Sequence, residues 1–292
     1  MVAFEGLLTA LVTPFRDGAL DEAAFRALVR RQIENGVDGL VPVGTTGEAP
    51  TLPIAEHVQV VRWTIEEAAG EVPVLAGIGS NDTATAVDTA RRVEELGAQG
   101  VLATAPYYNK PTQEGLYRHF SAIAAATPLE VCLYDVPGRT AVRILPATVE
   151  RLSEIENVTG LKDATGDLAN AVQVHRRCGE RITLFSGDDF TALPFLYVGG
   201  SGVISVASNV VPETMKELVT AAREGRLTDA RVLNERLFPL FEALFLETSP
   251  GPVKAALHAL GLLENELRLP LVPVSDETRQ RMLNVLRELG LT

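Results

Sequence analysis

The amino-acid sequence predicts a (β/α)8 barrel, the α/β fold also known as a TIM barrel, followed by a C-terminal helical extension. Three observations favour this fold. Short runs rich in Val, Ile and Leu recur roughly every 20 to 30 residues. The runs are apolar throughout rather than alternating, which is typical of strands buried on both faces of a parallel sheet. The segments between them have the spacing of amphipathic helices. An open doubly wound sheet is the alternative, but it rarely reaches eight near-equal units.

The predicted strands and helices alternate in order along the chain. The strand segments are 7–14, 39–44, 72–79, 100–106, 129–137, 158–165, 182–189 and 202–208. The helical segments that follow them are 21–35, 54–69, 82–96, 112–126, 146–155, 167–178, 190–197 and 212–224. In 82–96, for example, Val87, Ala90 and Val93 lie on one side of the helix, and Gly97 supplies its C-terminal stop.

The strand pattern stops after residue 224, and the rest of the chain has helical patterns only. The helical segments are 227–246, 250–262 and 275–289, with Pro-containing breaks at 249–252 and 269–274. We therefore divide the chain into a catalytic barrel, residues 1–224, and a C-terminal helical region, residues 225–292. A single barrel of about 250 residues is compatible with this length.

The composition is that of an acidic globular protein. Hydrophobic residues make up 46% of the 292, and 38 acidic against 26 basic side chains give a net charge of −12. An acidic chain is a poor candidate for nucleic-acid binding, and no apolar run reaches the ~18 residues of a membrane helix. The N-terminal apolar run lacks a basic start and stops at Pro14, so we interpret it as a strand rather than a signal peptide. With only Cys132 and Cys178, we expect no disulfide and a cytoplasmic location.

Chemistry in such barrels takes place at the C-terminal ends of the strands. The polar segments at those ends are GTTGE (44–48), YYNKP (107–111), YDVPGRT (134–140), KDATGD (162–167), SGDD (186–189) and SVASN (205–209). None of them contains a histidine, and the sequence has no H-E-x-x-H, Cys-x-x-Cys or G-x-x-x-x-G-K-[ST] motif. We therefore expect neither a metal nor a nucleotide cofactor.

Lys162 is the candidate nucleophile. The chain has 22 Arg but only 4 Lys, and Lys162 alone falls inside a predicted strand. Of the others, Lys110 is in a surface loop, Lys216 on a helix face, and Lys254 near a helix start. A lysine is rarely buried unless it is paired or functional, and a neutral amine can attack a ketone to form an iminium. The alternative is a structural ion pair with one of the acidic residues Asp163 and Asp188.

Three further features could complete a keto-acid site around that lysine. Tyr134, on the neighbouring strand, is a candidate proton donor and acceptor, or else a rim aromatic bonded to the backbone. Arg139 is a candidate clamp for a carboxylate, or else part of a surface salt bridge. The amides and hydroxyls of GTTGE are candidates for holding a carboxylate, or else form a helix start capped by Thr.

These segments together resemble a known enzyme family. Those that carry the resemblance are GTTGE (44–48), PYYNKPTQEGLYRHF (106–120), LYDVPGRT (133–140), GLKDATGD (160–167), LFSGDD (184–189), GGSGVISVASN (199–209) and PVK (252–254). From about residue 4 to the C-terminus, the chain is similar to the 4-hydroxy-tetrahydrodipicolinate synthase (dihydrodipicolinate synthase) family. This family lies within the pyruvate-dependent class I aldolase superfamily that includes N-acetylneuraminate lyase.

The resemblance implies a lyase of lysine and diaminopimelate biosynthesis that condenses pyruvate with L-aspartate 4-semialdehyde and uses no cofactor. It implies that Lys162 forms the iminium with pyruvate. Thr46, Tyr134 and Tyr108 match the proton relay, with Tyr108 inserted from a neighbouring subunit. The family pattern also implies a homotetramer built from two tight dimers.

The resemblance further implies the substrate-binding residues. Thr45 and Thr46 would hold the carboxylate of pyruvate, and Arg139 that of the semialdehyde. Gly187 and Ile204 would line the pocket near the attached pyruvate.

Two features favour the synthases over the neuraminate lyases, namely Thr45, where the lyases have Ser, and Arg139. One feature departs from the pattern, because Asp135 stands where Asn is more usual, and its carboxylate is expected to influence Tyr134 or Arg139. The alternatives are another pyruvate-dependent aldolase acting on a sugar keto acid, and, in a different class, a non-catalytic barrel that binds a small carboxylate.

The resemblance also implies weak or absent inhibition by lysine. Lysine-inhibited relatives bind the amino acid at the dimer interface near the position of Tyr107. Those relatives use a Glu and a His or Asn, and the matching positions here are Thr85 and Ile54. Thr85 cannot supply a negative charge, and the side chain of Ile54 cannot form a hydrogen bond.

Overall fold

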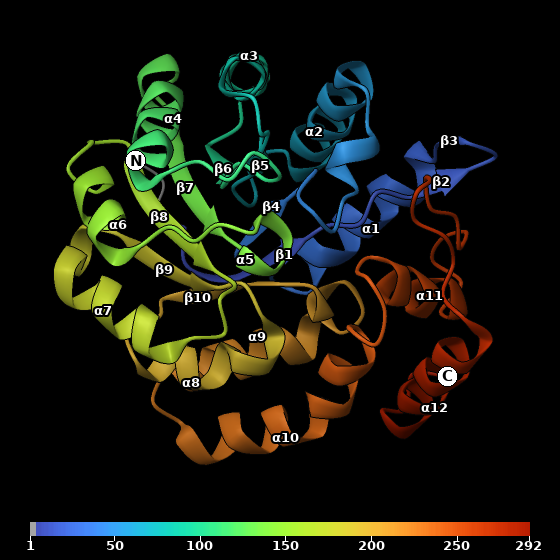
Figure 1. Ribbon diagram of the computed structural model, residues 1–292. Helices are drawn as coiled ribbons and strands as arrows, with labels where there is room; N and C mark the ends of the chain where they lie inside the picture. The colour runs from blue at the N-terminus through green and yellow to red at the C-terminus, as the bar shows by residue number, and fades with distance from the viewer. Residues whose placement is uncertain (1–3) are drawn as a thin grey trace.

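The computed structural model describes residues 4–292. A barrel of eight parallel strands is surrounded by helices, and the last helices pack to one side of it (Figure 1). The barrel strands are β1 (Gly6–Ala10), β4 (Gly39–Val41), β5 (Leu75–Gly77), β6 (Gly100–Thr104), β7 (Glu130–Asp135), β8 (Val158–Asp163), β9 (Thr183–Ser186) and β10 (Gly202–Ser205). Each lies inside its predicted segment or begins one residue before it. The predicted TIM barrel is therefore confirmed.

The barrel closes between its second and third strands in the chain. The order of hydrogen-bonded strands runs β4, β1, β10, β9, β8, β7, β6, β5. A parallel bridge between Leu40 and Val74 joins the two ends, and the Gly77 amide donates to the Pro42 carbonyl at 3.0 Å. A Cβ at Gly77 would lie 2.2 Å from the carbonyl oxygen of Val43, so this seam requires glycine.

Helices follow the strands as predicted. They are α1 (Glu22–Glu34), α2 (Ile54–Ala68), α3 (Thr83–Glu95), α4 (Gln113–Ala126), α6 (Pro146–Leu152), α7 (Leu168–Cys178), α8 (Ala192–Tyr197) and α9 (Pro212–Arg223). Polar side chains fix where several of them begin. Asp21, Asp82, Thr112 and Asp167 each accept a hydrogen bond from an amide in the first turn of α1, α3, α4 and α7, which satisfies a donor that the helix itself leaves free.

A short hairpin and a short helix are absent from the sequence prediction. The hairpin β2 (Phe15–Arg16) and β3 (Ala19–Leu20) turns at Asp17 and Gly18, whose φ angles of 54° and 81° are left-handed. An Asp-Gly pair is a known signal for such a turn. The helix α5 (Pro137–Thr140) begins where the predicted strand 129–137 was expected to end, with Pro137 in its first turn.

The region after residue 224 is helical, as predicted. It contains α10 (Leu227–Ala243), α11 (Gly251–Ala259) and α12 (Asp276–Glu288). In Figure 1, α10 lies outside α9, α11 and α12 pack together, and the segment between these last two helices runs beside the β2–β3 hairpin. The division into two regions at residue 224 stays a prediction.

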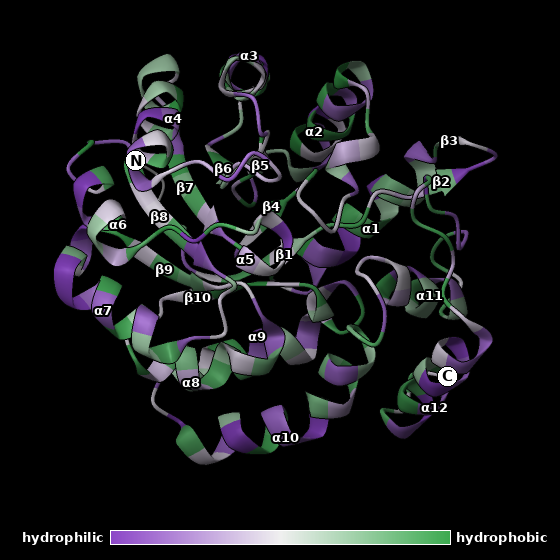
Figure 2. Ribbon diagram, viewed as in Figure 1, coloured by the Kyte–Doolittle hydropathy of each residue, from purple (hydrophilic) through white to green (hydrophobic). Residues whose placement is uncertain are grey.

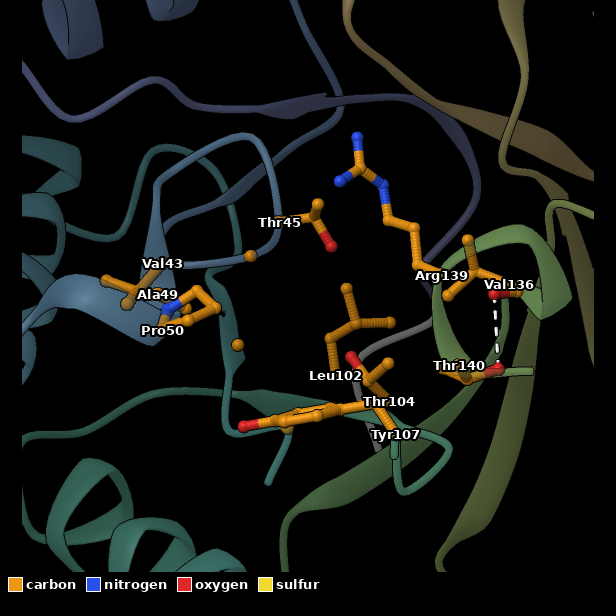
Figure 3. Close-up of a pocket in the computed structure, with 13 residues that line it drawn as sticks. Val43, Thr45, Ala49, Pro50, Leu102, Thr104, Tyr107, Val136, Arg139 and Thr140 are labelled. Atoms are coloured by element: carbon orange, nitrogen blue, oxygen red, sulfur yellow. Dashed lines mark hydrogen bonds between the residues drawn. The ribbon is translucent and has the colours of Figure 1, made fainter. Parts of the chain in front are cut away.

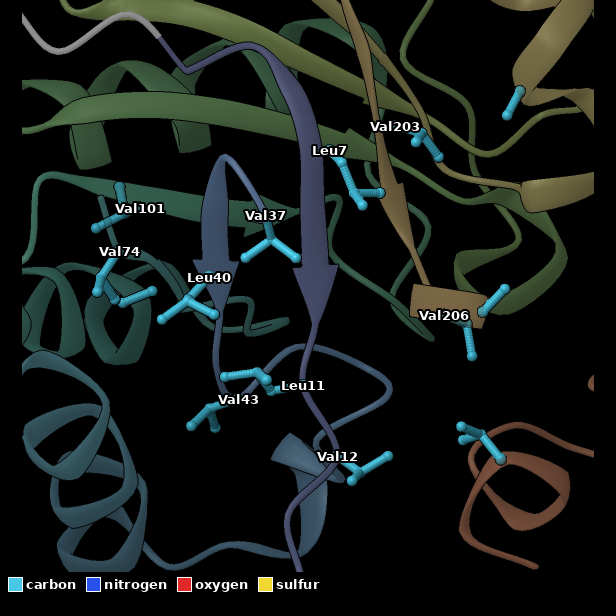
Figure 4. Packing of buried hydrophobic residues seen from close by; sticks show 14 of the residues in the cluster. Leu7, Leu11, Val12, Val37, Leu40, Val43, Val74, Val101, Val203 and Val206 are labelled. Carbon is cyan, nitrogen blue, oxygen red and sulfur yellow. The ribbon is translucent and has the colours of Figure 1, made fainter. Parts of the chain in front are cut away.

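Alternate strand residues serve two apolar layers. Leu8 and Ile204 belong to the cluster that fills the barrel. Their neighbours Leu7 and Val203 belong to the larger cluster between the strands and the helices (Figure 4). Hydrophobic colour accordingly follows the strands, and polar colour the outer faces of the helices (Figure 2). Across residues 4–292, no helix is long and apolar enough to cross a membrane.

Candidate active site

A cavity of about 600 Å³ opens at the C-terminal end of the strands. It is lined from the ends of β4, β7, β8, β9 and β10 and from the segment between α10 and α11. The lining residues are Thr45, Thr46, Tyr134, Val136, Gly138, Arg139, Lys162, Ala164, Gly187, Asp188, Val206, Phe245, Leu246, Glu247, Thr248 and Ser249. Six of the eight predicted site residues are therefore brought together in one cavity.

Lys162 and Tyr134 face each other inside this cavity. They are register partners on β8 and β7, and each is 5% exposed. The Lys162 Nζ lies 4.3 Å from the centre of the Tyr134 ring. A cation over an aromatic face is attracted to it, and the phenol and the amine are within reach of one substrate atom.

The alternative of an ion pair for Lys162 is wrong. Among the described residues, no carboxylate lies within 4.0 Å of its Nζ. The Asp163 carboxylate instead accepts from Asn170 Nδ2 at 2.9 Å and from the Thr165 amide at 2.8 Å. Asp188 lines the cavity, and burial raises its pKa to about 6, against the opposing effect of the Lys162 charge. The amine is thus left open to the cavity.

The GTTGE loop forms a tight turn rather than a capped helix start. The Glu48 amide donates to the Thr45 carbonyl at 3.1 Å, and the Gly47 amide donates to the Gly44 carbonyl at 3.1 Å. Thr13 Oγ1 donates to the Gly47 carbonyl at 2.7 Å. Glu48, the N-cap residue of the short helix η1 (Ala49–Thr51) that follows, makes no capping hydrogen bond through its side chain. Thr45 and Thr46 are held at the cavity wall by this turn.

Arg139 reaches the cavity from α5. Its Nη2 donates to the Ser249 carbonyl at 3.2 Å, and it has no ion-pair partner within 4.0 Å among residues 4–292. The surface salt bridge considered from the sequence is therefore wrong. A guanidinium with donors to spare at a cavity mouth is suited to bind a carboxylate.

A second cavity of about 240 Å³ adjoins the first. Thr45, Val136 and Arg139 line both, and Thr104 and Tyr107 line the second alone. Figure 3 shows Tyr107 along one side of it, with Thr45 and Arg139 opposite.

Tyr108 and Ile204 are the two predicted site residues outside the cavity lining. Tyr108 is 89% exposed, with a left-handed φ of 72°. Ile204 is fully buried in the barrel interior, in the same apolar cluster as Tyr134. Ile204 therefore supports the floor beneath the site, and Tyr108 points to solvent in the single chain.

The expected influence of Asp135 on Tyr134 or Arg139 is wrong. Successive strand residues point to opposite faces, so Asp135 faces away from Tyr134, toward the surrounding helices. Burial raises the pKa of Asp135 to about 7, and the nearby Asp163 charge adds to this effect. A backbone hydrogen bond from Ile144 and the charge of Arg143 oppose it. Neither Tyr134 nor Arg139 is among the groups that act on it.

Sequence reasoning missed three contributors to the site. Residues 245–249 form one wall of the cavity, and Asp188 another part of the lining. Lys254, interpreted from the sequence as an ordinary residue near a helix start, is completely buried against Glu48. No local sequence signal identifies this last contact, because the two partners are 206 residues apart. Within the described part of the chain, no group of three His, Cys, Asp or Glu side chains is arranged to hold a metal ion.

Known proteins resemble this chain over almost its full length. The model of the dihydrodipicolinate synthetase family matches residues 3–289. The 4-hydroxy-tetrahydrodipicolinate synthase of Pelobacter propionicus is 49% identical over 288 residues, covering 99% of each chain. That of Nitratidesulfovibrio vulgaris is 50% identical over 289 residues, with the same coverage. The crystal structure of dihydrodipicolinate synthase from Aquifex aeolicus superposes with a TM-score of 0.97 at 42% identity, covering 99% of each chain. The resemblance inferred from the motifs is confirmed.

Proposed function

The chain belongs to the dihydrodipicolinate synthetase family, and from this premise we propose that it condenses pyruvate with L-aspartate 4-semialdehyde. The product is 4-hydroxy-tetrahydrodipicolinate, an intermediate of lysine and diaminopimelate biosynthesis. The observation that carries the proposal is the Lys162 amine, which is buried and lies 4.3 Å from the Tyr134 ring centre in a cavity at the C-terminal end of the strands. Among residues 4–292 it has no carboxylate partner within 4.0 Å.

The reaction begins with attack of the neutral Lys162 amine on C2 of pyruvate. The carbinolamine loses water to give an iminium, and loss of a proton from C3 then gives an enamine. The C3 of the enamine adds to the aldehyde carbon of the second substrate, whose oxygen takes up a proton. The amino nitrogen of that substrate then adds to the iminium carbon, the bond to Lys162 breaks, and the free amine is restored.

Proton transfer falls to Tyr134, Thr46 and Tyr108. Tyr134 and Thr46 both line the cavity with Lys162, which supports their roles. Tyr108 lines neither of the two cavities at the strand ends, and its 89% exposure favours insertion into a neighbouring subunit. Each transfer requires a donor within hydrogen-bond reach of the reacting atom.

Substrate binding is assigned to the polar groups around the amine. Thr45 and Thr46 hold the carboxylate of pyruvate through amides and hydroxyls, and Arg139 holds that of the semialdehyde. Gly187 lines the cavity with Lys162, and its close packing requires glycine, because a Cβ there would lie 2.7 Å from the Ala164 Cβ. Ile204 acts from beneath the cavity, as apolar packing against Tyr134.

We also propose that the active molecule is a tetramer of two tight dimers in the cytoplasm. A dimer is the smallest assembly in which Tyr108 reaches a second site. The buried free thiols of Cys132 and Cys178 suit a reducing compartment.

The test is trapping combined with a substrate panel. Incubation with pyruvate and borohydride, followed by peptide mapping, is expected to place the reduced adduct on residues 160–167, with Lys162→Ala as control. An active enzyme without that adduct would overturn the proposed chemistry, as would the absence of any turnover. The second substrate is then identified by comparing aspartate semialdehyde with sugar keto-acid precursors. Higher kcat/KM for one of the latter would assign the chain to another aldolase.

A further inference from the structure

A fully buried ion pair connects the GTTGE loop to the C-terminal helices. Lys254 Nζ, in α11, donates to Glu48 Oε1 at 2.5 Å, and both side chains are 0% exposed. The two residues are separated by 206 positions in the sequence. The proposed chemistry uses neither of them directly.

The remaining polar atoms of this pair are also satisfied. Glu48 Oε2 accepts from the Arg268 amide at 3.0 Å, and Lys254 Nζ donates to the Glu266 carbonyl at 2.8 Å. Lys254 Nζ and the Arg268 guanidinium carbon lie 4.3 and 4.4 Å from the centre of the Phe15 ring.

Each cation of this network has a carboxylate partner. Arg268 pairs through two guanidinium nitrogens with Glu56, in the first turn of α2. The two cations thus lie over one aromatic ring, and the charge of Glu266 acts on both of them as well. Burial lowers the pKa of Lys254, and the charge of Glu48 opposes that effect.

Such a pair is a costly way to stabilise a fold. Removing two charges from water costs several kcal/mol per ion, and an apolar pair of similar volume is often as stable. A buried pair with all its hydrogen bonds formed does, however, fix the positions of its two backbones. Glu48 needs such fixing, because its backbone has a left-handed φ of 57°, which is uncommon outside glycine.

The backbone of Glu48 is coupled directly to the residues that line the cavity. Its amide donates to the Thr45 carbonyl at 3.1 Å, so a shift of Glu48 moves the turn that carries Thr45 and Thr46. On the other side, the turn is held by Thr13 through the Gly47 carbonyl. The loop is therefore anchored by Thr13 in the N-terminal segment, by Lys254 in α11 and by the Arg268 amide beyond α11.

We propose that Glu48 and Lys254 are positioning residues for pyruvate, and that the C-terminal helices thereby form part of the pyruvate site. This inference rests on the proposed function, in which Thr45 and Thr46 hold the pyruvate carboxylate. The ion pair sets the place and orientation of these groups without touching the substrate.

The test uses Glu48→Gln, Lys254→Met and the double variant Glu48→Gln/Lys254→Met. We expect the pyruvate KM to rise about tenfold or more in each folded variant, because a displacement of about 1 Å costs up to about 100-fold. The KM for the second substrate is expected to change by less than about twofold, since Arg139 is held separately by Ser249. The double variant leaves no unpaired buried charge, so it remains testable if Lys254→Met alone fails to fold.

Lys216→Met is the control, and it removes a half-buried ion pair. Lys216 Nζ donates to Asp38 Oδ1, also at 2.5 Å, but Asp38 precedes β4 at the opposite end of the barrel. A purely structural role predicts that the double variant resembles this control, with a changed melting temperature and an unchanged pyruvate KM, and that result would overturn the inference. Borohydride trapping of pyruvate on the parent enzyme distinguishes failure of the proposed function from failure of the positioning role. Failure of that reaction rejects the proposed function, whereas trapping on Lys162 with an unchanged KM in the variants rejects only the positioning role.

Discussion

The hydroxyl of Tyr134 is expected to matter for catalysis more than for binding. The Tyr134 ring faces the Lys162 amine at 4.3 Å, and Tyr134→Phe keeps that ring while removing its proton donor. We expect kcat to fall by about 100- to 10,000-fold, the range for loss of a general acid or base, with a small change in the pyruvate KM. Tyr117→Phe is the control, because Tyr117 stacks on Arg151 and lines neither cavity. A Tyr134→Phe enzyme with more than about a tenth of the parental kcat would contradict the assignment.

Asp135 is expected to make the fold less stable at high pH. Burial raises its pKa from an ordinary 3.8 to about 7, so between these values the unfolded chain releases the proton while the folded chain keeps it. Stability therefore falls as pH rises through this window, and the loss is complete above about pH 7. Asp135→Asn removes the titrating carboxyl group. We expect it to raise the free energy of unfolding by about 2 to 4 kcal/mol at pH 8, and this gain is expected to vanish near pH 4.

Thermal unfolding of the parent and Asp135→Asn across that pH range measures this effect. Asp163→Asn is the contrast, because Asp163 accepts hydrogen bonds from Asn170 and Thr165 and its replacement is expected to destabilise the fold. A gain for Asp135→Asn that does not depend on pH would show that titration of Asp135 is not its cause.

At the scale of elements, the strands and helices that depend on a local sequence pattern were predicted correctly. Each barrel strand is a short apolar run, and several helices have an apolar face and a polar start signal such as Asp82. The misplaced ends occur where the chain leaves the barrel for the site. There the apolar run extends beyond the last hydrogen bond between strands. In the predicted segment 129–137, for example, the strand ends at Asp135. Pro137 instead begins α5, which carries Arg139 into the cavity.

The starts of α2 and α3 bear on inhibition by lysine. Ile54 is the first residue of α2, and the Thr85 hydroxyl is occupied by the Asp82 carboxylate at 2.6 Å. Glu48, a possible substitute acceptor for an ammonium, is already bound by Lys254 and Arg268. Loss of a charge-assisted hydrogen bond weakens binding by about 10- to 100-fold. We expect little inhibition in initial-rate measurements with both substrates near KM, and half-inhibition below millimolar lysine would contradict this.

At the scale of the whole molecule, the proposed role of Tyr108 predicts that each active site is shared between two subunits. Lys162→Ala and Tyr108→Phe enzymes are each expected to be inactive. A mixed dimer would contain one complete site, so free exchange should restore about a quarter of the parental activity. Native mass spectrometry confirms that exchange has occurred. Mixed dimers without activity would show that Tyr108 works in its own subunit.

Long-range pairing is where sequence reasoning failed. A lysine near a helix start gave no sign that α11 would place Lys254 against Glu48, because nothing local encodes a partner 206 residues away. The same holds for Ser249 and Arg139, which are 110 residues apart. Lys162 and Tyr134 were predicted together because neighbouring strands in a barrel bring their ends together regardless of chain distance.

The Glu48–Lys254 contact also has a consequence for how the protein is made. A ribosome synthesises Glu48 long before Lys254, so a nascent chain that has completed β10 and α9 contains every strand of the barrel and no counterion for Glu48. An ionised carboxylate without a partner is not readily enclosed, and the GTTGE turn therefore has no settled position at that stage. Translation thus supplies every strand of the barrel before it supplies the residue that neutralises Glu48 beside the substrate pocket.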